Sequence, residues 1–421
     1  MPARSTLVVA ALTATLAAFG CVDAPGRVLT FSGSAVGREG EIIRRQLARF
    51  EATTGIDVAL RVTPDAADQR HQLYVQWLNG RALDPDVLQL DVVWVAEFAA
   101  AGWVTPLDPF APDAGRFFTP TIDAGRWQRR LYALPWFVDV GMLYWRTDLL
   151  PHAPGSLDEL ATLAGGAQRE GGVPFGLVLQ GARYEGLITG FTELLAAFGG
   201  AILDGDGRVV VDSEPGVAAL TWLRDAITRL EIVPEAVLTW QEEQTRFAFQ
   251  NGQAAMMRNW PYAYALLSDE AASRVAGRFA VASMPAAPGG RAGAALGGAA
   301  LAISAFSDRA ADGYRLIDFL LQPEQMIERA QVAGQFPPVR GLYESGALDD
   351  VLAIPAAAAR EVIERAVPRP VSPVYSELSE ILQVSLHRAL TGQQEPRPAL
   401  QEAAAAMRAL LVRTGLGEDG S

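Results

Sequence analysis

The sequence predicts an α/β protein built from two lobes. Short apolar strands alternate with amphipathic helices past residue 27, which is the pattern of an α/β sheet. The 421 residues suffice for two lobes that each bury a core, and a hydrophobic fraction of 50% is typical of a globular chain. Because no internal repeat, long linker or compositional boundary occurs, we expect the lobes to be interleaved or tightly joined.

The chain past residue 27 opens with a strand–helix–strand pattern. Val28–Phe31 is short and apolar and ends in Ser32-Gly33-Ser34. The next segment predicts a helix closed by Gly55, because one face collects apolar side chains, namely Ile42, Ile43, Leu47 and Phe50. A half-buried strand is expected beyond it, because apolar residues alternate at Ile56, Val58, Leu60 and Val62.

A second helix and a third strand complete this unit. Residues 68–79 predict a helix that ends at Gly80 and turns Leu73, Trp77 and Leu78 inward. The apolar segment 87–90 predicts the next strand, with Asp91 at its carboxyl end. Ligands of open α/β sheets collect at the carboxyl ends of the strands. Residues 32–34 and Asp91 are therefore expected to face one crevice.

The remainder of the chain continues the alternation. Residues 132–146 form a second dense apolar segment with Asp139 in its middle, and residues 296–304 predict a buried strand entered through two glycines. Helix starts are indicated by a capping box at Ser156 with Glu159 and by Glu214-Pro215. Helices are expected at about 308–321 and 323–333, and mostly helical structure from there to 413.

The first residues predict an export signal. Arg4 supplies a positive start, and Leu7–Gly20 is a run without charge. At about 1.5 Å per residue this run spans about 21 Å, too short for the ~30 Å core of a bilayer but typical of a signal peptide. No later stretch approaches the length of a membrane span.

Cys21, the only cysteine, directly follows that segment. Its position behind Gly20 favours lipid modification, although Ala18 and Phe19 depart from the usual pattern of a leucine followed by a small residue. We therefore predict a signal peptide with a lipid-modified cysteine at 1–21 and a tether at 22–27. The protein would be exported to the periplasm or cell surface and held at the membrane by the lipid alone.

Charge and motifs exclude several functions. A net charge of −13 with a sequence pI of about 4.8 repels the phosphates of nucleic acids. No common catalytic or nucleotide-binding motif occurs, so we predict no catalytic residue, cofactor or metal site. His71, His152 and His387 are isolated and are interpreted as surface or packing residues rather than metal ligands.

Two carboxylates stand in apolar surroundings, Asp91 between Leu90 and Val92 and Asp139 between two valines. A charge there is costly unless it is paired, so each aspartate is functional or salt-bridged. Carboxylates suit the hydroxyl rim of a sugar, as aromatic rings suit its apolar face. From these residues alone, a ligand contact and a capping or ion-paired aspartate are equally good interpretations.

Three further candidate binding residues lie next to prolines. Trp260 and Tyr262 flank Pro261, and a stiff turn reduces the entropy that stacking costs. Arg369 lies between two prolines that fix the place of its guanidinium. The alternatives are two core aromatics at a helix start and a surface arginine in an exposed link.

Seven segments follow one another along the chain, namely DPDVLQLDVVWVAEF (84–98), GWVTPLD (102–108), YALPWFVDVGMLYWRTDLL (132–150), QGARYEGL (180–187), RNWPYAY (258–264), ALGGAALAIS (295–304) and AVPRPVSPVYSELSEIL (366–382). Together they resemble the extracellular solute-binding proteins of carbohydrate ABC transporters, specifically the trehalose/maltose-binding group. Each segment is modest alone, but their order is specific, and the resemblance covers about residues 28–413.

The resemblance implies a two-lobed periplasmic-binding-protein-like fold of type II, with sugar bound in the cleft between lobes joined by chain crossovers. It suggests crossovers near 137–141, 296–300 and 321–324. The implied lobes are an N-terminal lobe of 28–138 plus 299–321 and a C-terminal lobe of 139–298 plus 322–421.

The same resemblance implies the residues of the cleft. Those matched to hydrogen-bonding positions are Glu39, Asp91, Asp139 and Arg369. Trp260 and Tyr262 match the stacking platform, and Gly298 lies on the crossover strand that lines the cleft. Secondary candidates for ligand contact are Arg70, Trp136 and Phe137.

Three positions depart from the family's pattern. A tryptophan expected after two glycines is Ala299, a tyrosine expected before Asp139 is Phe137, and a threonine expected before the helix of Gln69 and Arg70 is Ala67. Lost contacts of this kind leave the identity of the sugar open, because unmatched hydroxyls decide specificity. Trp136 either compensates for the missing ring or belongs to the core.

The resemblance implies that the protein, as a monomer, captures a trehalose- or maltose-like sugar. It would deliver this sugar to an ABC permease that is powered by cytoplasmic ATPases. One alternative is the same fold binding another oligosaccharide or a glycerol phosphodiester. A second is a secreted glycosidase that uses Asp91 and Asp139 as its acid and base.

Overall fold

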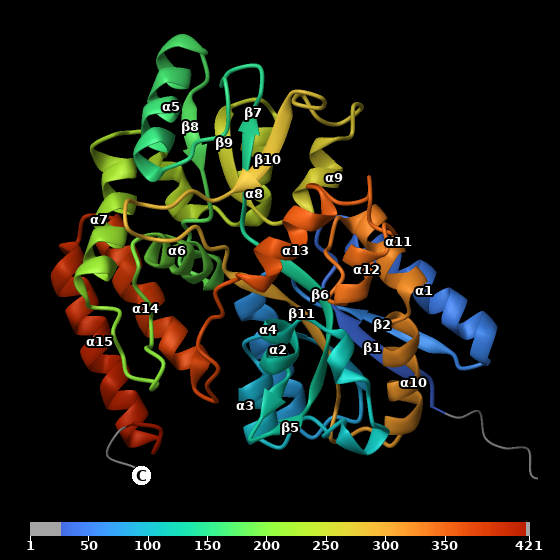
Figure 1. The fold of residues 1–421 in the computed structure, drawn as a ribbon. Helices are drawn as coiled ribbons and strands as arrows, with labels where there is room; N and C mark the ends of the chain where they lie inside the picture. The colour runs from blue at the N-terminus through green and yellow to red at the C-terminus, as the bar shows by residue number, and fades with distance from the viewer. Residues whose placement is uncertain (1–26, 418–421) are drawn as a thin grey trace, which may run out of the picture.

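The computed structural model describes residues 27–417, so the predicted signal peptide at 1–21, Cys21 and nearly all of the tether lie outside the described residues. Two sheets with helices packed around them form the molecule (Figure 1). The larger has the order β2 (Val58–Val62), β1 (Leu29–Gly33), β3 (Val87–Asp91), β11 (Leu296–Ile303) and β6 (Ala133–Val140). The smaller has the order β10 (Phe279–Ser283), β7 (Met142–Arg146), β9 (Ala254–Asn259) and β8 (Phe175–Val178). A short ribbon pairs β4 (Arg126–Trp127) with β5 (Arg130–Leu131).

The predicted opening unit is confirmed. The strands β1, β2 and β3 alternate with the helices α1 (Glu39–Thr54) and α2 (Ala67–Asn79), and β1 pairs in parallel with both other strands. Their carboxyl ends therefore share one edge of the sheet, where the backbone continues into Ser34 and Asp91. Helix α1 buries the predicted face and ends at Gly55, whose φ of 70° is the left-handed conformation that glycine adopts readily.

Two details of this unit were predicted wrongly. Val62 is 51% exposed rather than buried, because β2 is the edge strand of its sheet. In α2 the fully buried residues include Tyr74, whereas Leu73 and Trp77 are half-buried. The inward stripe is rotated toward Arg70, Tyr74 and Leu78, and the Tyr74 hydroxyl donates to the Ser32 carbonyl oxygen at 3.1 Å.

The dense apolar segment 132–146 forms two strands that belong to two sheets. Strand β6 ends at Val140 and β7 begins at Met142, so the chain passes between sheets at Gly141. A Cβ at Gly141 would lie 1.7 Å from Glu193 Oε1, so only glycine fits there. Strand β11 returns antiparallel to β6, with Gly297 opposite Asp139. The lobe boundaries predicted from the resemblance stay predictions.

Thirteen further α-helices follow among the described residues, and the helices predicted at 308–321 and 323–333 are α10 and α11. The bounds are α3 (Val95–Ala100), α4 (Thr119–Ala124), α5 (Leu157–Glu170), α6 (Glu185–Ala197), α7 (Glu214–Thr228), α8 (Glu242–Gln250), α9 (Ala263–Leu267), α10 (Ala310–Leu320), α11 (Pro323–Ala333), α12 (Arg340–Glu344), α13 (Ala356–Glu364), α14 (Tyr375–Leu390) and α15 (Pro396–Arg413). Three short 3₁₀ turns add η1 (Asp108–Phe110), η2 (Ala114–Arg116) and η3 (Glu235–Thr239).

Both predicted helix starts are present, but the Glu159 carboxylate has a different hydrogen-bond donor from the one predicted. Pro215 stands in the first turn of α7. Ser156 caps α5 by accepting from the Glu159 amide at 3.1 Å. The Glu159 carboxylate, however, accepts from the Gly155 amide at 2.6 Å rather than from Ser156, so only half of the capping box forms.

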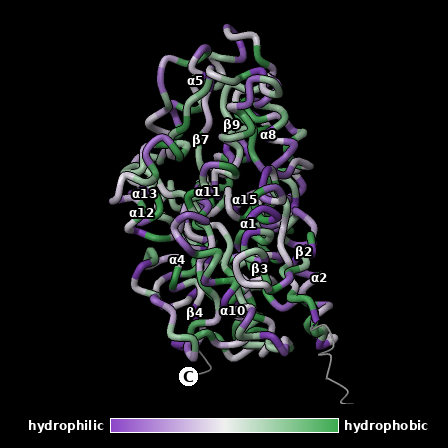
Figure 2. Tube along the Cα trace, turned by 90° about the vertical axis from the view of Figure 1, so that its right-hand side faces the viewer, coloured by the Kyte–Doolittle hydropathy of each residue, from purple (hydrophilic) through white to green (hydrophobic). Residues whose placement is uncertain are grey.

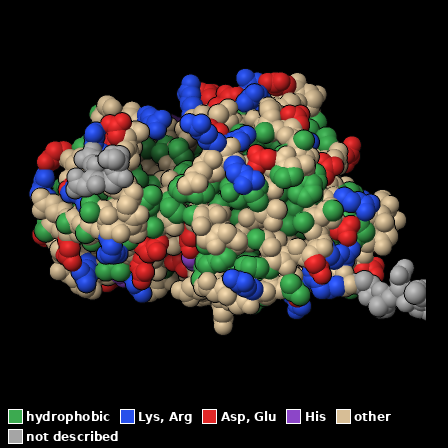
Figure 3. Space-filling view, turned by 90° about the horizontal axis from the view of Figure 1, so that it is seen from below, with side chains coloured by type: hydrophobic (Ala, Val, Ile, Leu, Met, Phe, Trp, Pro, Cys, Tyr) green, Lys and Arg blue, Asp and Glu red, His purple; other side chains and the backbone are tan. Residues whose placement is uncertain are grey.

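Polar and apolar residues are mixed along the chain (Figure 2) and over its surface (Figure 3). In Figure 2 hydrophobic and hydrophilic stretches alternate along the trace, and in Figure 3 acidic and basic side chains are interspersed over the face seen from below. Within residues 27–417 every helix is too short or too polar to form a transmembrane span.

Asp86 fixes the start of β3 against β1. It is fully buried, and its carboxylate accepts from the Thr30 amide at 2.8 Å and the Thr30 hydroxyl at 2.9 Å. Ser307 and the Arg27 guanidinium donate to the same carboxylate at 2.5 Å each. Four donors from two segments, residues 27–30 and Ser307, therefore depend on one side chain.

We expect Asp86→Ala to lower the free energy of unfolding by about 2–4 kcal/mol, because it leaves buried donors without an acceptor. Urea unfolding would measure the loss. The matched control is Asp308→Asn, since Asp308 pairs with the same Arg27 at 2.7 Å but is 64% exposed. That variant should unfold at the wild-type midpoint, and equal effects of the two substitutions would contradict the assignment.

Candidate functional site

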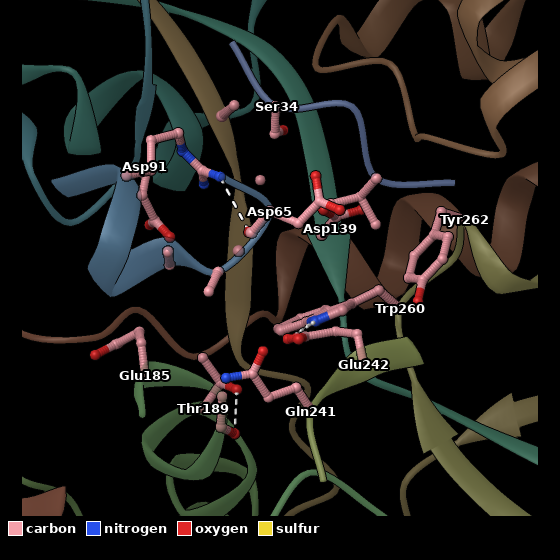
Figure 4. Close-up of a pocket in the computed structure, with 18 of the residues that line it drawn as sticks. Ser34, Asp65, Asp91, Asp139, Glu185, Thr189, Gln241, Glu242, Trp260 and Tyr262 are labelled. Atoms are coloured by element: carbon pink, nitrogen blue, oxygen red, sulfur yellow. Dashed lines mark hydrogen bonds between the residues drawn. The ribbon is translucent and has the colours of Figure 1, made fainter. Parts of the chain in front are cut away.

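A cavity of about 330 Å³ lies between the two sheets. Its walls come from the carboxyl ends of β1 and β3, from the crossover strands β6 and β11, and from the starts of α6 and α8 (Figure 4). Every primary candidate from the sequence lines it, together with two of the secondary ones: Glu39, Asp91, Asp139, Trp260, Tyr262, Gly298 and Arg369, with Arg70 and Phe137. The structure thus gathers these residues, while their contact with a ligand stays a prediction.

Glu39 enters the cavity from the first turn of α1. One carboxylate oxygen accepts from the Ser34 hydroxyl at 2.6 Å, and the other accepts from the Gln335 amide. Gln335 in turn accepts from the Arg329 guanidinium at 2.6 Å. Glu39 is therefore held in place by two neutral donors, and Gln335 stands between it and the Arg329 guanidinium.

Asp139 stands on β6, where the chain is about to cross between sheets. Its Oδ1 atom is buried and has no hydrogen-bond partner among the described residues. Burial, followed by the nearby Glu39 and Asp91 carboxylates, raises the pKa of Asp139 to about 8 from the usual 3.8. At neutral pH this side chain is thus mostly a neutral carboxylic acid, able to donate as well as to accept a hydrogen bond.

Arg369 joins the two walls of the cavity. Its guanidinium donates to Asp91 Oδ1 at 3.0 Å, at the end of β3, and to Glu185 Oε1 at 2.5 Å, at the start of α6. Burial alone would lower its pKa, but Asp91 and Glu185 raise it above the usual value. The arginine is only 4% exposed, so of the two predicted alternatives the fixed guanidinium is confirmed and the surface arginine is wrong.

Trp260 forms a flat wall on the opposite side. Its backbone amide donates to the Asn259 side chain at 2.8 Å, and its carbonyl oxygen accepts from the Tyr144 hydroxyl at 2.8 Å. The guanidinium carbon of Arg258 lies 3.9 Å from the centre of the indole ring. A cation against one face of the ring leaves the other face for the cavity, and it keeps the plate from tilting.

Tyr262 closes the cavity against the loop that follows β1. Its hydroxyl donates to Glu243 at 2.7 Å. A Cβ at Gly37, where φ is 56°, would lie 2.9 Å from the Tyr262 ring, so the loop approaches this ring as closely as glycine permits. The ring is 6% exposed. Tyr262 thus lines the cavity and also packs one half of the molecule onto the other.

Trp136 is a correction to the sequence prediction. It is 3% exposed and lies outside the cavity lining. The Arg329 guanidinium carbon lies 3.7 Å from its ring centre, and Phe31 packs edge-on against it at 5.5 Å. Trp136 therefore belongs to the core, as one of the two alternatives held, and it does not replace the missing aromatic ring.

The three departures from the family pattern all lie on the cavity wall, as Ala67, Phe137 and Ala299. Each offers carbon where the pattern has a hydroxyl or an indole. Gly298, beside them, has a φ of 108°, and a Cβ there would lie 2.3 Å from the Phe137 carbonyl oxygen. The crossover strand is thus fixed by backbone packing while its side chains are small.

Sequence reasoning missed several polar residues of the wall, of which Glu185, Glu242 and Gln335 are the most involved. Burial raises the pKa of both glutamates above the usual value. Glu242 lies 3.5 Å from the indole nitrogen of Trp260, which donates to it. Glu185 stands inside the matched segment 180–187, which was a usable signal, whereas an acidic first turn at α8 is indistinguishable from an ordinary helix start.

The histidines form no metal site. Within the described residues no three His, Cys, Asp or Glu side chains are grouped so as to hold a metal ion. His71 instead pairs with Glu97 at 2.9 Å and stacks on Phe98 with ring centres 5.7 Å apart.

Comparison with known proteins agrees with this architecture. The family model described as bacterial extracellular solute-binding protein matches residues 34–327. A probable ABC transporter-binding protein of Deinococcus radiodurans is 33% identical over 407 residues, covering 93% of this chain and 96% of the relative.

Solved structures agree as well. The maltose-bound MalE3 of T. maritima is 40% identical with a TM-score of 0.86, covering 91% of this chain and 99% of that one. A solute-binding protein from Thermotoga lettingae, solved with α-D-tagatose, has a TM-score of 0.83 at 23% identity over 91% of this chain and 99% of that one. The chain therefore belongs to the bacterial extracellular solute-binding protein family of ABC transporters and has its two-lobed type II fold.

Proposed function

We propose that this protein captures a trehalose- or maltose-like sugar outside the cytoplasmic membrane and delivers it to an ABC permease. The observation that carries the proposal is the pairing of an aromatic plate, Trp260 backed by Arg258, with carboxylates around the same cavity. A pyranose has an apolar face that stacks on such a plate and a rim of hydroxyls that donate to carboxylates.

The size of the cavity favours a short sugar. Ligand pockets of proteins hold about 300–1,000 Å³, and the 330 Å³ here is at the small end of that range. A mono- or disaccharide fits this volume better than a long glucan. The maltose in the T. maritima structure named above is a guest of the proposed class.

The ligand would act as the bridge that closes two lobes. Asp91 and Glu39 belong to the first sheet's side, while Trp260 and Glu185 belong to the other, and Arg369 and Tyr262 already span the boundary. A sugar that contacts both sides stabilises the closed form relative to the open one, and the closed form would dock on the permease. Lipid modification at Cys21 would hold this monomer near the permease and raise its effective concentration.

The two alternatives are less well supported. A glycerol phosphodiester carries a negative charge, which the carboxylates of this cavity would repel. A glycosidase would need Asp91 as a working carboxylate, but Arg369 holds one of its oxygens at 3.0 Å. Incubation with labelled trehalose and maltose decides between carrier and enzyme. We expect stoichiometric binding without cleavage, and catalytic turnover would overturn the proposal.

We expect Trp260→Ala to weaken sugar binding by about 1–3 kcal/mol, because the stacking surface is lost. Isothermal titration with the best sugar from a thermal-shift screen of trehalose, maltose, sucrose and longer glucans would measure it. Trp260→Phe keeps an aromatic face and should retain most of the affinity. If the alanine variant binds the sugar with wild-type affinity, the prediction that Trp260 stacks on the sugar is wrong.

Asp139 should make the stability of the ligand-free protein depend on pH. Because folding raises its pKa from 3.8 to about 8, the native state binds this proton more tightly than the unfolded state. The free energy of unfolding should therefore fall as the pH rises from about 4 to about 8, by up to about 1.4 kcal/mol per unit. Asp139→Asn removes this slope. Urea unfolding across that pH range should therefore show that the free energy of unfolding of the variant rises relative to that of the wild type as the pH rises. Parallel profiles would mean that Asp139 titrates normally.

A further inference from the structure

Three carboxylates of the cavity have no ion-pair partner among the described residues. Glu39, Asp139 and Glu242 come from α1, β6 and α8, and no arginine or histidine nitrogen lies within 4 Å of any of them. Three other carboxylates of the wall are matched, Asp91 and Glu185 by Arg369, and Glu243 by Arg246. Glu39, Asp139 and Glu242 are thus the leftover carboxylates, with no cation paired against them.

The nearby cations are committed elsewhere. Arg258 pairs with Glu193, and both side chains are 2% exposed. Arg329 is separated from Glu39 by Gln335. Arg70, which lines the cavity, donates to the backbone carbonyl oxygens of residues 64 and 65. None of these three guanidinium groups compensates the leftover carboxylates directly.

The carboxylates of the wall influence the protonation of Asp139. Burial, then Glu39 and Asp91, hold a proton on Asp139, with Glu242 adding to the same effect and Arg258 opposing it. The Oδ1 atom of Asp139 is buried without a hydrogen-bond partner. A buried carboxyl in this condition is stabilised by a cation or by hydrogen-bond donors, and the described side chains of the wall bring neither to this oxygen.

A metal ion does not fit as the missing cation. Within residues 27–417 no three of these acidic side chains are grouped closely enough to hold one. Hydroxyls of a neutral sugar donate hydrogen bonds but bring no charge. A guest that stacks on Trp260 and brings both hydrogen-bond donors and a positive charge would therefore partner these separated carboxylates more fully than a neutral sugar does.

We propose that the cavity selects a sugar bearing a protonated amine, an amino sugar, over its neutral parent, with the ammonium group placed at Asp139. The inference rests on the proposed function, since it names the class of sugar for the same site. An ammonium has three donors and a full charge, and a charge-assisted hydrogen bond is about twice as strong as a neutral one. On binding, Asp139 gives its proton to solvent and pairs with the ammonium as a carboxylate.

Matched sugars test the proposal by calorimetry at pH 7 and low salt. The first set is glucose, glucosamine and N-acetylglucosamine, and the second is trehalose with its 2-amino-2-deoxy analogue. The N-acetyl form keeps the nitrogen and removes its charge. We expect each amine to bind about 10-fold or more tightly than its neutral parent, and N-acetylglucosamine to show no such gain.

Asp139→Asn should abolish most of this preference, because the isosteric amide cannot carry the negative charge. The matched control is Asp65→Asn, since Asp65 also lines the cavity but is exposed and its charge is screened by water. The control should keep the preference for the amine. Melting temperatures of both variants without ligand confirm that they fold.

The outcomes separate the two proposals. Neutral sugars that bind as tightly as their amines overturn this inference and leave the proposed function standing. An amine preference that survives Asp139→Asn overturns the placement of the ammonium. If neither neutral nor amino sugars bind at all, the proposed function fails and this inference fails with it.

Discussion

The site depends on one buried ion pair, between Glu193 on α6 and Arg258 on β9. Two hydrogen bonds join them, one of 2.9 Å, and both side chains are 2% exposed. Glu193 also accepts from the Ala295 amide at 3.2 Å, just before β11, and it fills the space that a side chain at Gly141 would occupy. Arg258 in turn supports the Trp260 ring. The pair therefore contacts both strands that cross between the sheets, and the aromatic plate as well.

A buried pair of this kind contributes little net stability, because desolvation of two charges offsets most of their attraction. The Glu193–Arg258 pair instead restricts how the segments around it can pack, because both charges must stay paired. Residues 295 and 367 pair as a bridge, and two residues later Arg369 donates to the Leu296 carbonyl oxygen at 3.4 Å. The segment that presents Arg369 is thus aligned on the same crossover strand that the pair fixes. The start of β11 and the segment that carries Arg369 are thus positioned by the same set of contacts.

The sequence predicted what local patterns encode and missed what depends on distant partners. Strand and helix order, the faces of α1 and the caps follow from spacing and from glycine and proline, so the parallel opening unit could be derived. The stripe of α2 could not, because Tyr74 is turned inward by Ser32, which lies far away in sequence. Arg258 opens the matched segment 258–264, but its role could not be predicted, because that role exists only once α6 places Glu193 against it. The secondary candidate Trp136 failed for the same reason, because only folding places Arg329 over its ring.

The departures at Ala67, Phe137 and Ala299 and the leftover carboxylates have a common consequence. Where the family pattern has a hydroxyl or an indole, this wall offers carbon, which neither donates to a carboxylate nor screens it. Asp139, on the same strand as Phe137, has a buried oxygen without a hydrogen-bond partner among the described residues. A guest that supplies both donors and charge would gain more here than in a wall that already provides them. The three departures and the proposed preference for a cationic sugar thus concern the same wall of the cavity.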